Sequence, residues 1–245
     1  MARKAIDPKA QWNRVAEAYA RREIGRDSFP YDVLGRFEKV RFLEAGSGDG
    51  DVSIFMAEQG SDAVGLDISD VFLEISNRKI AGRDLDNIRF IQGDVRQMPF
   101  REQEFDLIYS CGVIEHFEET FESLAEHCRV LKDGGHILIG VPCKQGLHYP
   151  LKSLMQKIGI YDIGYEKSYS KAVFQRELER KGLTIQERYY FPMSATTNQS
   201  RIKYLLTKVA SALDRRIGGT MMMFFLCRKR GETTSPDIES AGSLQ

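Results

Sequence analysis

A glycine-rich stretch with acidic neighbours is the first place where the residue types suggest chemistry. Three glycines fall at alternate positions in residues 46–50, Glu44 precedes them, and Asp49 and Asp51 lie within and after them. Such a turn between a strand and a helix lets a ligand approach the main chain, because glycine has no Cβ and tolerates positive φ. The carboxylates would repel a phosphate, so the stretch favours a nucleotide-like ligand that carries positive charge.

Two further acids, Asp67 and Asp94, each close an apolar run that has the pattern of a strand. A carboxylate at the end of the second strand can accept hydrogen bonds from both hydroxyls of a ribose. Asp67 could instead cap the following helix, but Ser69 and Asp70 are better placed for that role. For Asp94 alone, the alternative is an ordinary turn aspartate.

The spacing Glu44-x-Gly46-x-Gly48-x-Gly50 resembles motif I of the class I S-adenosylmethionine (SAM) methyltransferases. That cofactor carries a sulfonium, an ammonium and a carboxylate but no phosphate, which suits an acidic loop. Taken alone, the loop could also be an ordinary glycine turn, since short motifs have false positives.

Other segments add to this resemblance, and the first of them is similar to the leading helix of ubiquinone/menaquinone-biosynthesis-type methyltransferases. These segments are Trp12–Tyr19, Asp94–Val95, Met98–Phe100, Cys111–Phe117 and Arg129–Gly135. The resemblance covers residues 8–142 through motifs and residues 170–228 through topology only.

The resemblance implies SAM as cofactor, S-adenosylhomocysteine (SAH) as product, and a set of cofactor contacts. Tyr19 would reach the carboxylate end of SAM, although it could equally be a packing residue of its helix. Asp67 would bind the ribose, and Asp94 with Val95 would read the adenine. The full set of contacts that we expect is Tyr19, Glu44, Gly46, Ser47, Gly48, Asp67, Ile68, Asp94, Val95 and Cys111.

One histidine, His116, is the best candidate for a catalytic base. Methyl transfer to a hydroxyl often needs a base, and this residue follows the fourth predicted strand. Glu115 and Glu166 are weaker candidates, and His116 could instead only cap or pack its loop. No tight set of acids and amides at the strand ends indicates a metal site, so we expect none.

The elements that must position these residues alternate between strands and helices, which predicts parallel βαβ units. Strands are expected at 42–45, 63–69, 88–94, 105–110, 136–142, 183–191 and 221–228, and helices at 8–26, 51–58, 71–80, 120–131 and 170–181. The fold class is α/β, and the resemblance implies a Rossmann-like seven-stranded sheet. Its order would be 3-2-1-4-5-7-6 with the last strand antiparallel and helices on both faces. Ligands bind at the carboxyl ends of strands in such sheets.

Length and composition fit one domain of residues 1–230, with cap insertions at about 143–169 and 192–219 and a disordered tail at 231–245. The 245 residues include 35 lysines and arginines against 35 aspartates and glutamates, so we expect no nucleic-acid partner. Four scattered cysteines and a charged N-terminus without an apolar leader favour the cytoplasm.

The predicted function is SAM-dependent methyl transfer, in line, to a small-molecule acceptor and most readily to oxygen. One alternative is an NAD(P)-dependent oxidoreductase, but the third glycine of GxGxxG is replaced by Asp51, and Glu44 and Asp94 would have no role. Another is a methyltransferase-like module that only binds a partner, against which the intact glycine loop argues.

A basic segment, Arg201–Arg216, has apolar residues at helical spacing. It could lie on an anionic membrane and serve an apolar or lipid-linked acceptor, which would make the protein peripheral at a membrane. It could equally be a lid helix whose apolar side packs on the domain.

Overall fold

The computed structural model describes residues 7–19, 29–146, 149–150, 153–154, 165–191, 209, 212–213, 216 and 219–231. The strands are β1 (Arg41–Ala45), β2 (Asp62–Asp67), β3 (Ile88–Gln92), β4 (Phe105–Cys111), β5 (Leu131–Pro142), β6 (Leu183–Phe191) and β7 (Met222–Lys229). The helices are α1 (Pro8–Tyr19), α2 (Tyr31–Leu34), α3 (Asp51–Glu58), α4 (Asp70–Ile80), the 3₁₀-helix η1 (Ile114–His116), α5 (Thr120–Val130) and α7 (Lys171–Arg180).

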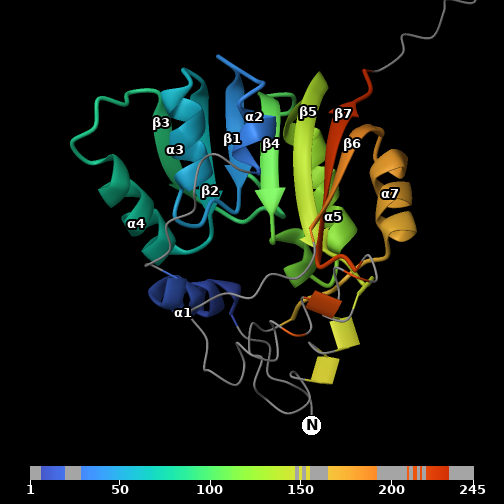
Figure 1. Ribbon diagram of the computed structural model, residues 1–245. Coiled ribbons are helices and arrows are strands. Elements are labelled where there is room, and N and C mark those ends of the chain that lie inside the picture. The colour runs from blue at the N-terminus through green and yellow to red at the C-terminus, as the bar shows by residue number, and fades with distance from the viewer. Residues whose placement is uncertain are drawn as a thin grey trace, which may run out of the picture.

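The strands form one seven-stranded sheet in the order β3-β2-β1-β4-β5-β7-β6. Neighbouring strands are parallel from β3 through to β5, whereas β7 runs antiparallel to both β5 and β6. The predicted fold class and strand order are therefore confirmed. All the parallel strands end at the same edge of the sheet, and α1 lies beyond that edge (Figure 1).

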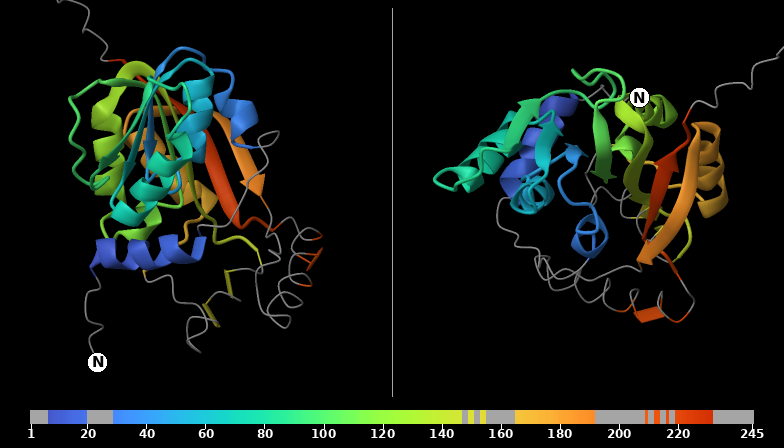
Figure 2. Two further views of the ribbon diagram at one scale, coloured as in Figure 1. Left: turned by 90° about the vertical axis from the view of Figure 1, so that its left-hand side faces the viewer. Right: turned by 90° about the horizontal axis from the view of Figure 1, so that it is seen from above.

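The two faces of the sheet carry separate hydrophobic cores, because successive strand residues point to opposite sides. Leu43 and Ile108 pack with α5 and α7 on one face. Phe42 and Leu107 pack with α2 and α3 on the other. Figure 2 shows these helices on both sides of the twisted sheet. The strand ends between the two cores are thereby held in fixed positions.

The start of β5 differs from the prediction. The sequence predicts a helix that ends at residue 131 and a strand that begins at residue 136, but α5 ends at Val130 and β5 begins at the next residue. Leu131 pairs with Phe105, and the register then shifts before His136 pairs with Leu107. Gly134 has a φ of +75°, which glycine tolerates. The residue therefore allows an irregularity within the strand and does not end the helix.

Several predictions fall wholly or partly outside the described residues. The helix expected at 8–26 is described only to Tyr19. Of the basic segment 201–216, the structure describes only four residues, all of them helical: Val209, Ala212, Leu213 and Arg216. The apolar side chains of Val209 and Leu213 are 53% and 45% exposed. Whether that segment binds a membrane or forms a lid stays a prediction, as do the cap insertions and the tail. Within the described part of the chain, no helix has the length and apolar character needed to cross a bilayer.

Candidate active site

A cavity of about 830 Å³ opens at the carboxyl ends of β1, β2 and β4 and is bordered on one side by α1. It brings together most of the residues that the sequence singled out, although they come from four separate stretches. The predicted residues that line it are Glu44, Gly46, Gly48, Asp67, Ile68, Asp94, Val95, Cys111 and His116. Ser47 is buried beside the cavity without lining it. Tyr19 ends α1, and its side chain lies outside the described part of the structure.

Asp67, at the end of β2, holds two loops together while it lines the cavity. Its Oδ2 accepts a hydrogen bond of 2.8 Å from the Gly48 amide, and its Oδ1 accepts one of 2.9 Å from the Ser69 amide. The carboxyl group is only 7% exposed, and burial raises its pKa against the lowering effect of these amides. Ser69 is the N-cap of α4, since its Oγ accepts from the Phe72 amide, so Asp67 is not the capping residue.

The three loop glycines are required for different reasons. A Cβ at Gly46 would overlap Val113, and one at Gly50 would lie 2.6 Å from the Phe90 ring, so these positions are closed by packing. A Cβ at Gly48 would meet no heavy atom within 4 Å. Because Gly48 lines the cavity, that open space is available to a ligand. Its φ of +51° is also one that residues with a Cβ rarely adopt.

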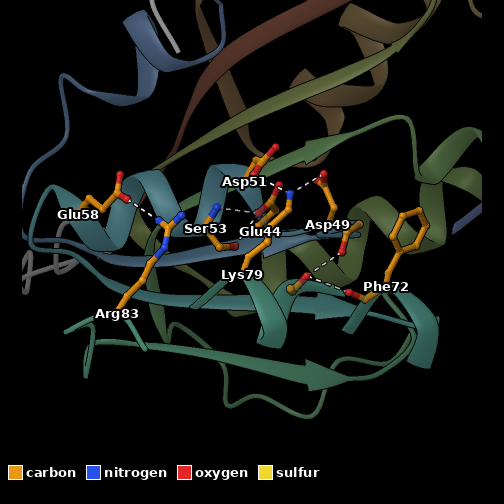
Figure 3. Close-up of polar contacts among 10 residues, drawn as sticks. Glu44, Asp49, Asp51, Ser53, Glu58, Phe72, Lys79 and Arg83 are labelled. Atoms are coloured by element: carbon orange, nitrogen blue, oxygen red, sulfur yellow. Dashed lines mark hydrogen bonds and ion pairs between the residues drawn. The ribbon is translucent and has the colours of Figure 1, made fainter. Parts of the chain in front are cut away.

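Lys79 of α4 neutralises much of the acidic loop, a pairing that the sequence did not reveal. Its Nζ lies 2.7 Å from a carboxylate oxygen of Asp49 and of Asp51. Figure 3 shows Lys79 between these two acids. The two aspartates are therefore partly satisfied within the protein, and less of the negative charge faces the cavity than the sequence suggests. Helical periodicity could have placed Lys79 on the last turn of α4, but not opposite a loop 28 residues away.

Glu44 is the acid of this loop that has no cationic partner among the described residues. Its Oε2 accepts hydrogen bonds from the Ser53 amide at 2.8 Å and the Ser53 hydroxyl at 2.6 Å. Burial, with the nearby Asp49 and Asp51 charges adding to it, raises the pKa of Glu44 to about 8 despite those hydrogen bonds. The carboxyl group is thus poised to lose its proton when positive charge enters the cavity.

This pKa makes folding stability depend on pH in a predictable direction. The pKa of Glu44 is raised from its ordinary value of 4.5 to about 8. The contribution of its protonated form to folding stability is therefore fully present below pH 4.5 and is lost as the pH rises through about 8. A Glu44→Gln substitution should therefore raise the Tm relative to wild type more at about pH 8.5 than at about pH 5.5. Thermal unfolding followed by circular dichroism at the two pH values measures this difference.

Glu126 supplies the control, because its pKa is lowered, chiefly by the Arg129 guanidinium. A Glu126→Gln variant should change the Tm by a similar amount at both pH values, since that carboxylate is ionised throughout this range. An equal change at both pH values for Glu44→Gln would contradict the assignment.

The carboxylate of Asp94 is already engaged by Arg96. Nε of Arg96 lies 3.0 Å from Oδ1 of Asp94, and Nη2 lies 2.6 Å from Oδ2. Although burial opposes it, this pairing holds the pKa of Asp94 below its ordinary value. Asp94 still lines the cavity, next to the buried side chain of Val95. A ligand at this wall would meet an ion pair rather than a lone carboxylate.

His116 lies in η1, directly after β4, and its ring orientation is fixed from two sides. Its Nδ1 lies 2.7 Å from the main-chain oxygen of Tyr165, and its ring meets that of Trp12 edge-on, with centroids 4.8 Å apart. A carbonyl oxygen can only accept, so Nδ1 must carry the proton. In the neutral ring, the lone pair then resides on Nε2, the nitrogen that a base requires.

The helix α1 is anchored to α4 by polar contacts that the sequence did not reveal. The amide of Asn13 donates to Asp70 at 2.8 Å and accepts from the Ser69 hydroxyl at 2.6 Å, while Lys9 pairs with Asp70 at 2.8 Å. These contacts hold Trp12 in the cavity wall. They also link α1 to the same strand end that positions Asp67.

Cys111 contributes an uncharged thiol to the wall of the cavity. Burial raises the pKa of its thiol to about 12, so it remains protonated and is a poor nucleophile at neutral pH.

Together the cavity offers a buried carboxylate, an open glycine, an acidic lining and an oriented imidazole. Such a site can bind a polar ligand with positive charge and accept a proton from a second molecule.

Residues 43–139 match a family model described as a methyltransferase domain. A demethylmenaquinone methyltransferase of Clavibacter sepedonicus is 33% identical over 147 residues, which is 57% of this chain and 59% of that protein. One from Chlorobaculum tepidum is 28% identical over 60% of this chain and 53% of its own length. The chain thus matches somewhat over half the length of these relatives.

The fold has matching solved structures. A structure of an S-adenosylmethionine-dependent methyltransferase from Mesorhizobium loti has a TM-score of 0.61 and 17% identity, and the likeness covers 84% of this chain and 100% of that one. At this identity the likeness bears on the fold alone.

Proposed function

We propose that this chain is a class I SAM-dependent methyltransferase and that it transfers a methyl group from SAM to an oxygen of a small-molecule acceptor. The observation that carries the proposal is the cavity itself, which joins the glycine loop and Asp67 to the oriented imidazole of His116. Membership of that family implies the donor. The acceptor and the atom that is methylated are the finer part of the proposal.

The residues present fit the cofactor. Asp67 is a buried carboxylate at the cavity, as recognition of a ribose requires, and Gly48 leaves room where a side chain would project. Glu44 and the other acids of the wall suit a ligand with an ammonium and a sulfonium. Glu44, Gly46, Gly48, Asp67, Ile68, Asp94, Val95 and Cys111, which line the cavity, would hold it. These contacts, like those expected of Ser47 and Tyr19, are predictions.

When bound, SAM supplies an electrophilic methyl group on a positively charged sulfur. Charge is lost as the methyl group is transferred, so the protein chiefly aligns the acceptor and excludes water. The cavity lining also includes Val113, Phe117, Pro142 and Met222, which favours an acceptor with an apolar body. A quinone-like or lipid-linked molecule would have this character.

Calorimetry of the purified protein with SAH and with NAD tests the cofactor. We expect micromolar-class binding of SAH and none of NAD at millimolar concentration, because the acidic loop disfavours a pyrophosphate. Incorporation of a radiolabelled methyl group from SAM into a panel of hydroxylated small molecules then tests the acceptor. Tight NAD binding without SAH binding would refute the proposal.

His116 is proposed as the base that takes the proton of the acceptor hydroxyl. The hydrogen bond from its Nδ1 to the Tyr165 carbonyl puts the lone pair of the neutral ring on Nε2, which would accept that proton. A His116→Asn variant should lose about 100-fold in kcat, the lower end of the usual contribution of a general base. Its SAH affinity should stay within a few-fold of wild type.

Two measurements separate catalysis from packing. Nitrogen chemical shifts of the imidazole should show the Nδ1–H tautomer for neutral His116, without any acceptor present. A His136→Asn variant is the matched control, since that histidine contacts Phe37 and does not line the cavity. Unchanged turnover and pH profile in His116→Asn would leave His116 as a packing residue only.

A further inference from the structure

A second, smaller cavity of about 230 Å³ lies beside the first. Among the residues that the structure describes, its lining consists of two lysines, two tyrosines, two serines and one carboxylate, that of Glu166. The residues are Lys144, Tyr149, Ser153, Tyr165, Glu166, Lys167 and Ser168. None of the expected cofactor contacts is among them.

Each of the two lysines is placed over an aromatic ring rather than on an acid. Nζ of Lys144 lies 5.9 Å from the ring centroid of Tyr149, and Nζ of Lys167 lies 5.6 Å from that of Tyr169. An aromatic face attracts an ammonium without neutralising it. Within the described part of the chain, neither lysine forms an ion pair, so both positive charges are available to a ligand.

The short segment 165–168 borders both cavities. The main-chain oxygen of Tyr165 holds the ring of His116, and the amide of Lys167 donates to the main-chain oxygen of Glu115 at 2.9 Å. Glu166 lines both cavities. The smaller cavity is therefore bordered by the same segment that orients the proposed base.

The two cavities differ in the sign of their charge. Among the described residues, seven carboxylates and one arginine line the larger cavity, and Lys79 and Arg96 offset part of that negative charge by pairing with Asp49, Asp51 and Asp94. Two lysines and one carboxylate line the smaller cavity. An anionic group would be disfavoured in the first and favoured in the second. The same contrast would orient an acceptor that has one anionic end, with that end in the smaller cavity.

We propose that the smaller cavity is an anion subsite for the methyl acceptor, with Lys144 and Lys167 binding a carboxylate or phosphate group. This rests on the proposed function, and it specifies that function's substrate as an anionic molecule with an apolar body. The anionic group is held at Lys144 and Lys167 while the body extends past Glu166 to His116. The lysines act on binding of the acceptor and not on that of the cofactor.

Titration of inorganic phosphate and of benzoate into the full-length protein, saturated with SAH, tests the subsite and distinguishes the two anions. At least one should bind, more weakly as sodium chloride is added. Lys144→Gln and Lys167→Gln should each weaken that binding about fivefold, the effect of one partly exposed charge. Replacing both lysines by arginine should preserve it.

Lys171→Gln is the matched control, because that ammonium also lies over a tyrosine ring, 3.9 Å from the Tyr190 centroid, but does not line the cavity. It should leave anion binding unchanged. The proposal is overturned if neither anion binds the wild type, or if the Lys144→Gln, Lys167→Gln double variant binds as well as the wild type. SAH affinity, measured in the same samples, reports separately on the cofactor site.

Discussion

An Asp67→Ala variant is expected to bind SAH about 100-fold more weakly than wild type, because two hydrogen bonds to a charged acceptor contribute about 3 kcal/mol together. The carboxyl group is buried at the cavity, where water replaces a lost protein partner poorly. Calorimetric titration with SAH at physiological salt measures the change. The size of the effect follows from burial as much as from the number of bonds.

Asp67→Ala also removes structural hydrogen bonds, and a control must separate the two effects. The amides of Gly48 and Ser69 both lose their acceptor, at a cost to stability of about 1–3 kcal/mol for each amide left unsatisfied. Ser69→Ala disturbs the same loop by removing the cap of α4 and the contact with Asn13. If Ser69→Ala weakened SAH binding as much as Asp67→Ala does, loop damage rather than ribose recognition would be the cause.

The sheet was predictable because its pattern is local. Apolar strands alternate with helices, and the acids at their ends mark where the strands stop, so the sequence alone places Asp67 and Asp94 at one edge. Strand order came from the family resemblance. Glu44, Gly48 and His116 meet in one cavity for the same reason, since the carboxyl ends of parallel strands share an edge.

The partners that decide the electrostatics were not predictable, because they depend on side chains that meet across elements. Lys79 reaches Asp49 and Asp51 from α4, and Arg96 takes the carboxylate of Asp94. The sequence therefore overstated the negative charge of the loop. The orientation of His116 depends on the carbonyl of Tyr165, 49 residues further on, which carries no sequence signal at all.

A Gly48→Val variant is expected to show no measurable SAH binding at millimolar ligand. A Cβ at Gly48 meets no protein atom within 4 Å, so the added side chain would project into the space that the cavity leaves for the ligand. The variant should still fold, with strain of about 1–3 kcal/mol from a φ of +51° that a branched side chain rarely adopts. Calorimetry gives the affinity and thermal unfolding gives the strain.

Gly82 provides a close comparison for this substitution. It also has a positive φ, of +78°, and a Cβ there would also meet nothing within 4 Å, but the residue does not line the cavity. Gly82→Val should therefore lower the Tm by a similar amount and leave SAH affinity unchanged. Equal losses of affinity in the two variants would mean that backbone strain is responsible, and full affinity in Gly48→Val would mean that the loop is not the cofactor cradle. Only a loss confined to Gly48→Val supports the placement of the cofactor against the glycine loop.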